Sequence, residues 1–316
     1  MTKIVVLGAS GMLGSMLVEY FAASREFALR ATVRDANARG FLRSLRPRVE
    51  LVRLDAETCT VEDVLAATHG AAWVINAIGL IKQRIVDSDP TLVERAIRTN
   101  AVFPHTLARA AQIADFRVVQ VATDCVYSGA SGGYSESAAH DCLDVYGKSK
   151  SLGEISADCV LNLRCSIVGL ERGSNLSLLD WFLSQPQSAT VNGFTNHRWN
   201  GITTLHFARI CAGIIKTGLR LPSLMHVVPA DEISKDGLLR LFAEVFGRRD
   251  VEIVPIEAKT AVDRTLTTEH AEANSLIWRA AGYARPPSIG QMVEELGVYR
   301  AQSAARAGAT SDLQGV

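Results

Sequence analysis

Apolar and polar positions follow two different periods along the first eighty residues. The run Lys3–Leu7 is rich in β-branched residues and ends at a glycine, which is typical of a buried parallel strand. Apolar side chains then recur at helical spacing on one helix face: Leu13, Met16, Leu17, Tyr20 and Phe21. Further strand-like runs follow, separated by helical segments: Ala28–Val33, Val49–Leu54 and Trp73–Ile78. Short strands that alternate with helices predict an α/β fold with a Rossmann-type, doubly wound parallel sheet.

The later part of the chain predicts a second, smaller lobe. Two more strand-like runs, Val118–Ala122 and Cys159–Leu163, bring the sheet to six or seven strands. After Val168 the pattern becomes irregular, and helical patterns return at Leu205–Ile215 and Asp236–Phe246. The organisation that we expect is an NAD(P)-binding domain over residues 1–168 with a return segment near 200–218, a C-terminal substrate-binding lobe mainly over 169–300, and a disordered tail over 301–316.

The overall composition excludes several classes of protein. Of the 316 residues, 48% are apolar and 21% are charged, as in an ordinary globular chain. The 33 basic residues balance 33 acidic ones, so we expect no nucleic-acid partner. The longest weakly polar stretch, Gly70–Ile81, is shorter than the ~20 residues of a membrane span, so we expect no membrane association. Scattered cysteines without CxxC pairs, and an apolar N-terminal run too short for a signal peptide, favour a cytoplasmic protein.

A glycine-rich turn follows the first strand. In Gly8-Ala-Ser-Gly11-Met-Leu-Gly14, Gly8 suits a tight turn, Gly11 lets the backbone approach a pyrophosphate, and Gly14 lets the helix pack closely. The N-terminus of the following helix offers N–H groups and a positive dipole end to phosphates. A glycine triplet also occurs in ordinary strand–helix turns, but the strand before it and the amphipathic helix after it favour dinucleotide binding.

The residue at the end of the second strand bears on the choice of cofactor. An acidic side chain there would accept hydrogen bonds from the ribose hydroxyls of NAD, whereas a guanidinium suits the 2′-phosphate of NADP. This chain has Arg34, followed by Asp35. Because the arginine comes first at the strand end, the sequence favours NADP(H) as the cofactor, with NAD(H) as the alternative. The alternative is that Arg34 is an ordinary surface arginine.

A tyrosine and a lysine four residues apart are candidates for acid–base chemistry. In Tyr146-Gly-Lys-Ser-Lys150 the two side chains share one helix face. A free phenol has a pKa of about 10, and a lysine cation beside it favours the phenolate, which would bring proton transfer toward neutral pH. Most chance YxxxK matches are surface helix residues. Thr123 strengthens the interpretation, because it ends a predicted strand where its hydroxyl can bind a substrate carbonyl.

Together these motifs resemble the extended short-chain dehydrogenase/reductases. Within that group, three segments are similar to the dTDP-4-dehydrorhamnose reductase (RmlD-like) family: Ala122–Gly129, Tyr134–Glu136 and Val145–Glu154. The similarity is strongest from Met1 to about Gly169 and remains visible at Asn200–Thr203 and Asp263–Leu266. It implies an enzyme that reduces a nucleotide-linked 4-keto-6-deoxy sugar with NAD(P)H.

The resemblance implies roles for individual residues. Tyr146 would donate a proton to the forming alkoxide, Lys150 would hold the cofactor ribose, and Thr123 would orient the carbonyl. Cofactor contacts are implied for Gly8, Ser10, Gly11, Met12, Leu13, Arg34, Asp55, Ala56, Ala77, Ile78, Gly79, Tyr146, Lys150 and Cys165. Substrate contacts are implied for Thr123, Asp124, Cys125, Thr203 and Arg264. Two alternatives are structural: Asp55 as a helix cap, and Arg264 paired with Asp263 or Glu269.

Positions that differ from the family pattern exclude one reaction, water elimination, and do not identify the sugar substrate. Nucleotide-sugar 4,6-dehydratases, which resemble this branch, carry Thr-Asp-Glu where this chain has Thr123-Asp124-Cys125. A thiol is a poor substitute for a carboxylate in water elimination, so we expect no dehydratase. The RmlD-like branch usually has an aromatic residue in place of Cys125. The segment Trp181–Trp199 is only weakly similar to that branch, although we expect the overlapping segment Asn192–Thr203 to supply the sugar-binding pocket. The seven histidines show no metal-ligand spacing, and we expect no metal.

Three functions are compatible with these features. The first is a nucleotide-sugar reductase, for which a homodimer is a possible assembly. The second is an epimerase that retains NAD between two hydride transfers and uses the same residues. The third is a cofactor-binding regulatory subunit without activity, against which the intact set of Thr123, Tyr146 and Lys150 counts.

Overall fold

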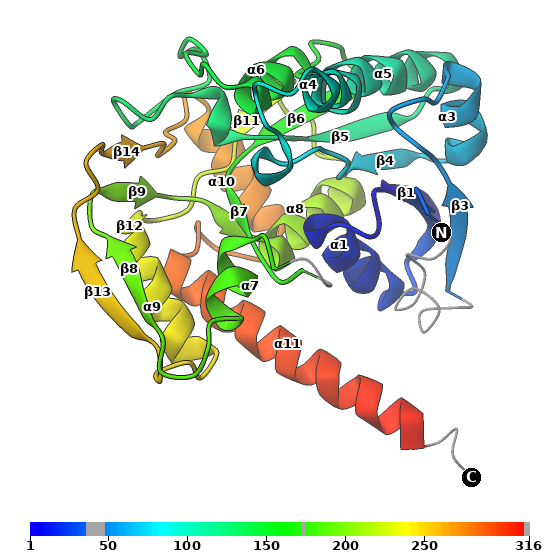
Figure 1. The fold of residues 1–316 in the computed structure, drawn as a ribbon. Helices are drawn as coiled ribbons and strands as arrows, with labels where there is room; N and C mark the ends of the chain where they lie inside the picture. Colours follow the sequence, from blue (N-terminus) through cyan, green and yellow to red (C-terminus); the bar gives the residue numbers. More distant parts are fainter. Residues whose placement is uncertain (36–47, 172–174, 313–316) are drawn as a thin grey trace.

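A parallel sheet of seven strands forms the centre of the molecule (Figure 1). The structure is a computed structural model, and it describes residues 1–35, 48–171 and 175–312. In spatial order the strands are β11 (Leu224–His226), β6 (Val160–Arg164), β5 (Arg117–Ala122), β4 (Trp73–Asn76), β1 (Thr2–Leu7), β2 (Phe27–Val33) and β3 (Val49–Arg53). The strand order changes direction between β1 and β4, and this is the point where doubly wound sheets bind their ligands.

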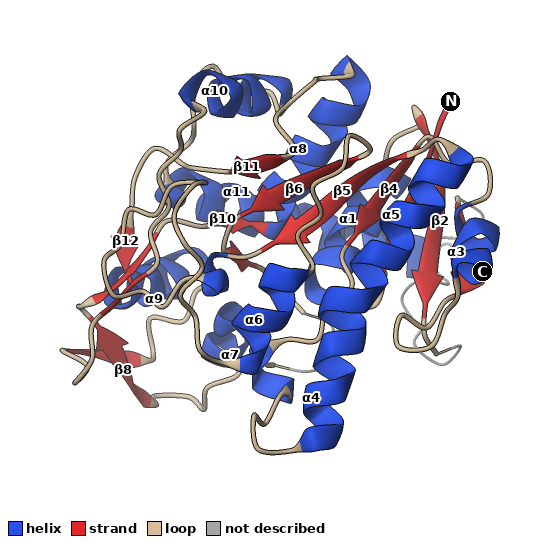
Figure 2. Ribbon diagram, turned by 90° about the horizontal axis from the view of Figure 1, so that it is seen from above, coloured by secondary structure: helices blue, strands red, loops and turns tan. Residues whose placement is uncertain are grey.

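Helices cover both faces of this sheet, as Figure 2 shows from above. They are α1 (Met12–Ala22), α3 (Val61–Thr68), α4 (Pro90–Ile97), a π-helical turn (Arg98–Val102), α5 (Phe103–Ala114), α6 (Val145–Leu152) and α8 (Thr204–Thr217). Side chains of β1 alternate between two cores: Ile4 and Val6 join the core with α1 and α8, whereas Val5 and Leu7 join the core with α3 and α5. The helices α4 and α6 pack against each other beside α5.

The smaller lobe lies beyond the carboxyl ends of the central strands (Figure 1). Its short sheets pair β8 (Thr190–Phe194) with β13 (Glu252–Ile256), β7 (Ile167–Val168) with β10 (Ile202–Thr203), and β9 (His197–Trp199) with both β12 (Ile233–Ser234) and β14 (Val262–Asp263). Its helices are α7 (Leu178–Leu183), α9 (Lys235–Val245), α10 (Ala271–Ala280) and α11 (Ile289–Asp312). Within the described ranges, no helix combines the length and apolar character that crossing a bilayer requires.

Most elements of the sheet agree with the prediction from sequence. All six predicted strands are present, and their ends differ from the predicted ends by at most two residues. The two later helical patterns correspond to α8 and α9. The predicted return segment, residues 200–218, is chiefly α8, and the seventh strand, β11, comes after it. The sheet therefore takes a strand from farther along the chain than the pattern indicated.

The end of the chain differs from the prediction. The prediction of a disordered tail is wrong for Ala301–Asp312, because α11 continues through these residues, whereas residues 313–316 lie outside the described part. The helix starts in the core, where Met292 and Leu296 are fully buried, so no new nucleation is needed to extend it. Alanine, which provides five of the twelve residues 301–312, is the strongest helix former, and Ser303 donates a hydrogen bond to Glu19 on α1.

Candidate active site

The turn between β1 and α1 has the geometry that phosphate binding requires. Gly8 has a φ of +82°, which side chains rarely adopt. A Cβ atom on Gly14 would lie 2.0 Å from the carbonyl oxygen of Gly8, so α1 can approach the turn this closely only with glycine there. Gly11 is the N-cap of α1 and provides no side-chain hydrogen bond, which leaves the first N–H groups of the helix available to an anion.

A cleft of about 860 Å³ runs along the carboxyl ends of the central strands. It brings together residues from the glycine-rich turn, from the ends of β2 to β6, and from the smaller lobe. Of the residues predicted from sequence, all but Thr203 line it: Gly8, Ser10, Gly11, Met12, Leu13, Arg34, Asp55, Ala56, Ala77, Ile78, Gly79, Thr123, Asp124, Cys125, Tyr146, Lys150, Cys165 and Arg264. Their position in one cleft is a finding, while their contacts with a ligand stay predictions.

Three charged side chains form a chain of ion pairs at the ends of β2 and β3. Arg34 Nη1 lies 3.3 Å from Glu57 Oε1. Arg95, on α4, donates to both oxygens of Glu57, from Nε at 3.0 Å and from Nη2 at 2.8 Å. The hydrogen bonds from Arg95, aided by the charge of Arg34, lower the pKa of Glu57, so this carboxylate is ionised at neutral pH. Glu57 lines the cleft, and sequence reasoning missed it.

Asp55 forms a turn and does not cap a helix. Its Oδ1 accepts a hydrogen bond from the backbone N–H of Glu57 at 3.1 Å. The N-cap of α3 is Thr60, whose hydroxyl accepts from the N–H of Asp63. The helix-cap alternative for Asp55 is therefore wrong, and this side chain remains at the wall of the cleft.

The loop after β4 is tied to helix α6 by Asn100. This asparagine lies in the π-helical turn between α4 and α5. Its Oδ1 accepts from the N–H of Leu80 at 2.8 Å, and its Nδ2 donates to the Leu80 carbonyl at 3.0 Å and to the Ser149 hydroxyl at 3.1 Å. Because Leu80 lines the cleft and Ser149 is on α6, Asn100 fixes the cleft wall relative to Tyr146. Sequence reasoning missed Asn100 as well.

Helix α6 carries Tyr146 and Lys150 on the face that lines the cleft. Asp144 caps the helix by accepting from the N–H of Gly147 at 2.8 Å. A Cβ atom on Gly147 would lie 2.4 Å from the carbonyl oxygen of Cys125, so glycine lets α6 pack directly on the segment after β5. This close packing brings the YxxxK pair to the end of β5, as the sequence predicted.

Burial sets the protonation of the two α6 side chains. Lys150 is 7% exposed, and its Nζ donates to the Val121 carbonyl at 2.7 Å. Burial lowers the pKa of Lys150 to about 8, opposed in part by the charge of Glu154. Burial also raises the pKa of the Tyr146 phenol above its ordinary value, although a hydrogen bond with Thr123 opposes the shift. The sequence predicted a pKa lowered by Lys150; instead burial dominates, and the phenol keeps its proton at neutral pH.

Thr123, Asp124 and Cys125 form the turn after β5. The Thr123 hydroxyl donates to Asp124 Oδ1 and accepts from the N–H of Cys125, both at 3.2 Å. Asp124 is 6% exposed; burial raises its pKa, and the charge of Arg264 opposes this. Burial, together with the Asp124 carboxylate, raises the pKa of Cys125 to about 12. Cys125 is therefore a neutral thiol and offers no base for water elimination.

Arg264 enters the cleft directly after β14. Its Nε donates to the Tyr127 carbonyl at 2.8 Å, and its Nη2 donates to the Ser128 carbonyl at 3.2 Å. Among the described residues it forms no ion pair, so the alternative pairing with Asp263 or Glu269 is wrong. Backbone carbonyls thus orient the guanidinium without neutralising its charge.

Other cleft residues come from the smaller lobe and from the loop after β4. His197, Arg198 and Trp199 on β9 line the cleft, which agrees with the predicted contribution of the segment 192–203. Sequence reasoning did not single out Lys235, at the start of α9, or Lys82, whose Nζ lies 2.7 Å from Asp144 Oδ2. Lysines and arginines on exposed elements carry no sequence signal that separates them from ordinary surface residues.

Thr203 has a different role from the predicted one. It is the N-cap of α8: its hydroxyl accepts from the N–H of His206 at 3.3 Å and lies 2.7 Å from His206 Nδ1. The residue is 1% exposed and does not line the cleft. The Thr203 hydroxyl is occupied by its hydrogen bonds with His206 at the start of α8, so Thr203 is not assigned to substrate binding.

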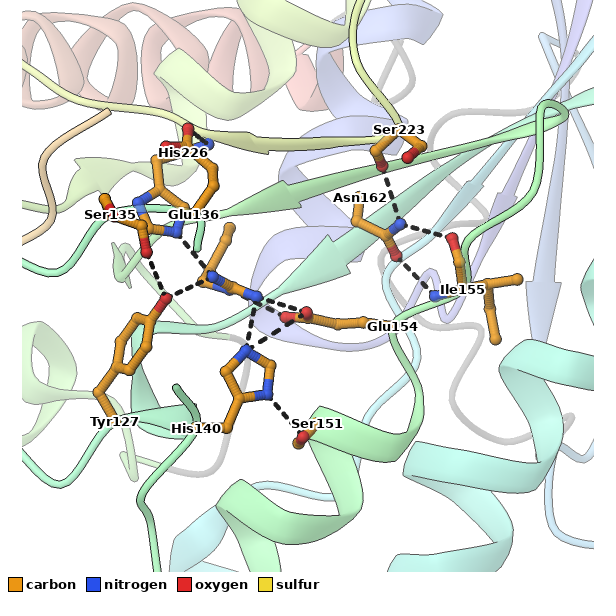
Figure 3. Close-up of polar contacts among 11 residues, drawn as sticks. Tyr127, Ser135, Glu136, His140, Ser151, Glu154, Ile155, Asn162, Ser223 and His226 are labelled. Carbon is orange, nitrogen blue, oxygen red and sulfur yellow. Dashed lines mark hydrogen bonds and ion pairs between the residues drawn. The ribbon is translucent and has the colours of Figure 1, made fainter. Parts of the chain in front are cut away.

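Behind the cleft, a buried arginine connects the segments that carry Thr123 and Tyr146. Arg164, at the end of β6, is fully buried, and its five N–H groups make five hydrogen bonds. The acceptors are both oxygens of Glu154 at 3.0 and 2.5 Å, the Tyr127 hydroxyl at 2.5 Å, His226 Nε2 at 2.7 Å and His140 Nε2 at 2.8 Å. Figure 3 shows the four acceptor side chains pointing toward one another. Glu154 follows α6 and Tyr127 follows the Thr123 turn, so one side chain ties both segments to the sheet.

Solved structures of similar fold include three sugar-nucleotide enzymes. The dTDP-4-dehydrorhamnose reductase of Yersinia enterocolitica is 14% identical, with a TM-score of 0.71 over 94% of this chain and 99% of its own. The same enzyme of Bacillus anthracis, in complex with NADP, is 16% identical, with a TM-score of 0.68 over 95% and 99%. The UDP-glucuronic acid 4-epimerase of Bacillus cereus, in complex with UDP-glucuronic acid and NAD, is 16% identical, with a TM-score of 0.72 over 95% and 99%.

A family match is more specific than these shared folds. No curated protein matches the chain in sequence. Residues 1–296, nearly the whole chain, match the family described as the RmlD substrate binding domain. The glycine-rich turn, the Thr123 turn and the YxxxK helix all lie inside the matched range and meet in one cleft. This chain belongs to the RmlD substrate binding domain family.

Proposed function

We propose that this protein is an NAD(P)H-dependent reductase of a nucleotide-linked 4-keto-6-deoxy sugar. The observation that carries the proposal is a single cleft that joins the phosphate-binding turn to Thr123, Tyr146 and Lys150. Relatives of the same fold support it, because two of them are dTDP-4-dehydrorhamnose reductases and one of these was solved with NADP.

The three side chains have separate roles in a carbonyl reduction. The nicotinamide, when bound, supplies a hydride to the carbonyl carbon. Tyr146 donates its phenolic proton to the carbonyl oxygen, so that the carbon–oxygen double bond becomes an alcohol. Lys150 holds the cofactor ribose, and its cation stabilises the phenolate that Tyr146 becomes. Thr123 turns its single O–H from Asp124 to the substrate carbonyl and so orients it. The protonated phenol, partly buried at the wall of the cleft, fits a proton donor.

The substrate enters from the side of the smaller lobe. Arg264 is oriented by two backbone carbonyls and keeps its charge, which suits the pyrophosphate of a nucleotide sugar. Trp199 and His197 line the same wall, and aromatic side chains there suit contact with a sugar or a base. The cofactor enters at the glycine-rich turn, where Arg34 favours the 2′-phosphate of NADP(H), with NAD(H) accepted as well.

Activity on a defined substrate panel tests the proposal. The purified chain is mixed with NADPH and a series of dTDP- and UDP-4-keto-6-deoxy sugars, and cofactor fluorescence is followed. We expect saturable NADPH oxidation with at least one sugar. Tightly bound NAD on purification, with sugar interconversion and no net oxidation, would establish the epimerase alternative. NADPH binding without consumption by any sugar would overturn the reductase and favour a regulatory subunit.

The assembly and the compartment are part of the same proposal. All six cysteines are free thiols in the structure, which supports a reducing compartment such as the cytoplasm. Exposed apolar side chains along α4, the π-helical turn and α5 support a homodimer: Ile97, Val102 and Ile113 are 43%, 54% and 65% exposed. Light scattering on the wild type and on Val102→Glu tests the dimer, and a wild-type monomer at micromolar concentration would exclude it.

A further inference from the structure

The carboxylate between Arg34 and Arg95 bears on which cofactor the cleft accepts. We propose that Glu57 is a specificity-determining residue that weakens the preference for NADP(H), so that the chain binds NADPH and NADH with similar affinity. The inference rests on the proposed function, because it requires a nicotinamide dinucleotide in this cleft. It concerns the adenosine end alone and does not depend on the sugar.

Glu57 occupies a place that the local sequence pattern does not reveal. The acidic residue that accepts ribose hydroxyls in NAD-selective sheets lies at the end of the second strand, where this chain has Arg34. The fold supplies a carboxylate to the same corner from the loop after β3, with Glu57 Oε1 at 3.3 Å from Arg34 Nη1. Both side chains line the cleft. The corner therefore holds the cation that suits a 2′-phosphate and an anion that repels it.

Arg95 keeps this carboxylate in place. It donates to Glu57 from two nitrogens, at 3.0 and 2.8 Å, in the bidentate geometry that fixes a carboxylate most firmly. The Glu57 side chain is 21% exposed, whereas that of Arg34 is 58% exposed and free to adjust. When a 2′-phosphate approaches Arg34, Glu57 cannot turn away without breaking both bonds. The guanidinium must be shared between the phosphate and Glu57.

The balance of charge in this corner supports the same conclusion. Arg34, Asp55 and Glu57 line the cleft, and Arg95 pairs with Glu57 from behind. Among the described residues, these four groups contribute two positive and two negative charges, which cancel. A phosphate monoester carries about −1.5 to −2 charges at neutral pH, and a neutral corner gives it little net attraction. Neutralising Glu57 alone leaves a net charge of +1. One unit of charge beside a phosphate is worth roughly fivefold to twentyfold in affinity at partly solvated distances.

Cofactor titration of Glu57→Gln tests the inference without any sugar. NADPH and NADH are each titrated into the wild type and the variant, with cofactor fluorescence as the readout. We expect wild-type Kd values within about tenfold of each other. In Glu57→Gln the Kd of NADPH should fall at least fivefold and that of NADH should change less than twofold, and the gain should shrink at high salt because it is electrostatic.

Two further variants separate charge from shape. Glu94→Gln removes the same charge from α4, where Glu94 pairs with the exposed Arg98 outside the cleft, and should leave both Kd values unchanged. Glu57→Asp keeps the charge and should keep the wild-type ratio within about threefold. An unchanged NADPH:NADH ratio in Glu57→Gln, or an equal change in Glu57→Asp, would overturn the inference. If the wild type binds neither cofactor, the proposed function itself fails.

Discussion

Replacing Arg164 with methionine should destabilise the fold more than any other single charge removal near the cleft. The guanidinium is fully buried and donates five hydrogen bonds, two of them to Glu154. Methionine has a similar length and no charge, so the variant fills much of the space but removes all five hydrogen bonds and the positive charge that faces Glu154. The side chain of Glu154 is 11% exposed, and water can reach it only in part.

The magnitude follows from the loss of one partner of a buried ion pair. Such a loss costs about 3–5 kcal/mol, because the remaining carboxylate stays buried and uncompensated. A domain has only about 5–15 kcal/mol of stability in total, so Arg164→Met should unfold at a much lower urea concentration. The double variant Arg164→Met/Glu154→Gln should recover about 1–3 kcal/mol of this loss, since no uncompensated charge remains.

Urea unfolding followed by tryptophan fluorescence measures these differences. The matched control is Arg98→Met, which removes an arginine from the exposed i,i+4 pair with Glu94 on α4 and should cost less than about 1 kcal/mol. A loss for Arg164→Met no larger than that of the control would refute the reasoning. So would a double variant less stable than the single one, because it would show that the charge of Glu154 is not what makes the arginine necessary.

Four further predictions concern the cleft and the buried histidines. Tyr146→Phe should lower kcat at least ~10²-fold and leave the Kd of NADPH nearly unchanged; more than half of the activity remaining would remove Tyr146 as the acid. Arg264→Ala should raise KM for the nucleotide sugar more than it lowers kcat, and steady-state kinetics would show the reverse if Arg264 only supports the Tyr127 loop. Gly14→Ala should abolish cofactor binding in titrations, because its Cβ would overlap the Gly8 carbonyl; wild-type affinity would contradict the close turn. The free energy of unfolding should fall as the pH drops below about 6.5, because burial lowers the pKa of His206 to about 3 and also lowers the pKa values of His140 and His226, so that the unfolded chain binds protons that the folded chain does not. Urea unfolding at pH 7.5 and 5.5 measures this difference, and equal stability at the two pH values would contradict neutral histidines in the fold.

The features that could be predicted from the sequence are those determined by local pattern. The glycine spacing around Gly11 and the four-residue spacing of Tyr146 and Lys150 each reflect one strand–helix turn or one helix face, so sequence alone placed them correctly. Strand ends were equally predictable because buried parallel strands form short apolar runs. These are also the features that carry the proposed chemistry.

The features that could not be predicted depend on contacts between distant segments. Glu57 meets Arg34 across 23 residues because neighbouring strands end at the same edge of the sheet. Arg164 meets His226 across 62 residues for the same reason. Asn100 meets Leu80 across 20 residues because the π-helical turn before α5 packs on the loop after β4. Thr203 shows the opposite error: its resemblance to a family motif suggested a substrate contact, whereas the start of α8 uses its hydroxyl as a cap.

Protonation is the property of the site that depends most on burial. Spacing alone predicts that Lys150 lowers the pKa of Tyr146, but the fold turns the ammonium toward the Val121 carbonyl and leaves Tyr146 partly buried at the cleft wall. Burial then disfavours the charged form of each group, so the phenol keeps its proton, and the lysine, with a pKa of about 8, remains mostly a cation at pH 7. A protonated phenol beside a cation is poised to give its proton to an oxygen that gains negative charge. This is the proton transfer that the proposed reduction of a carbonyl requires.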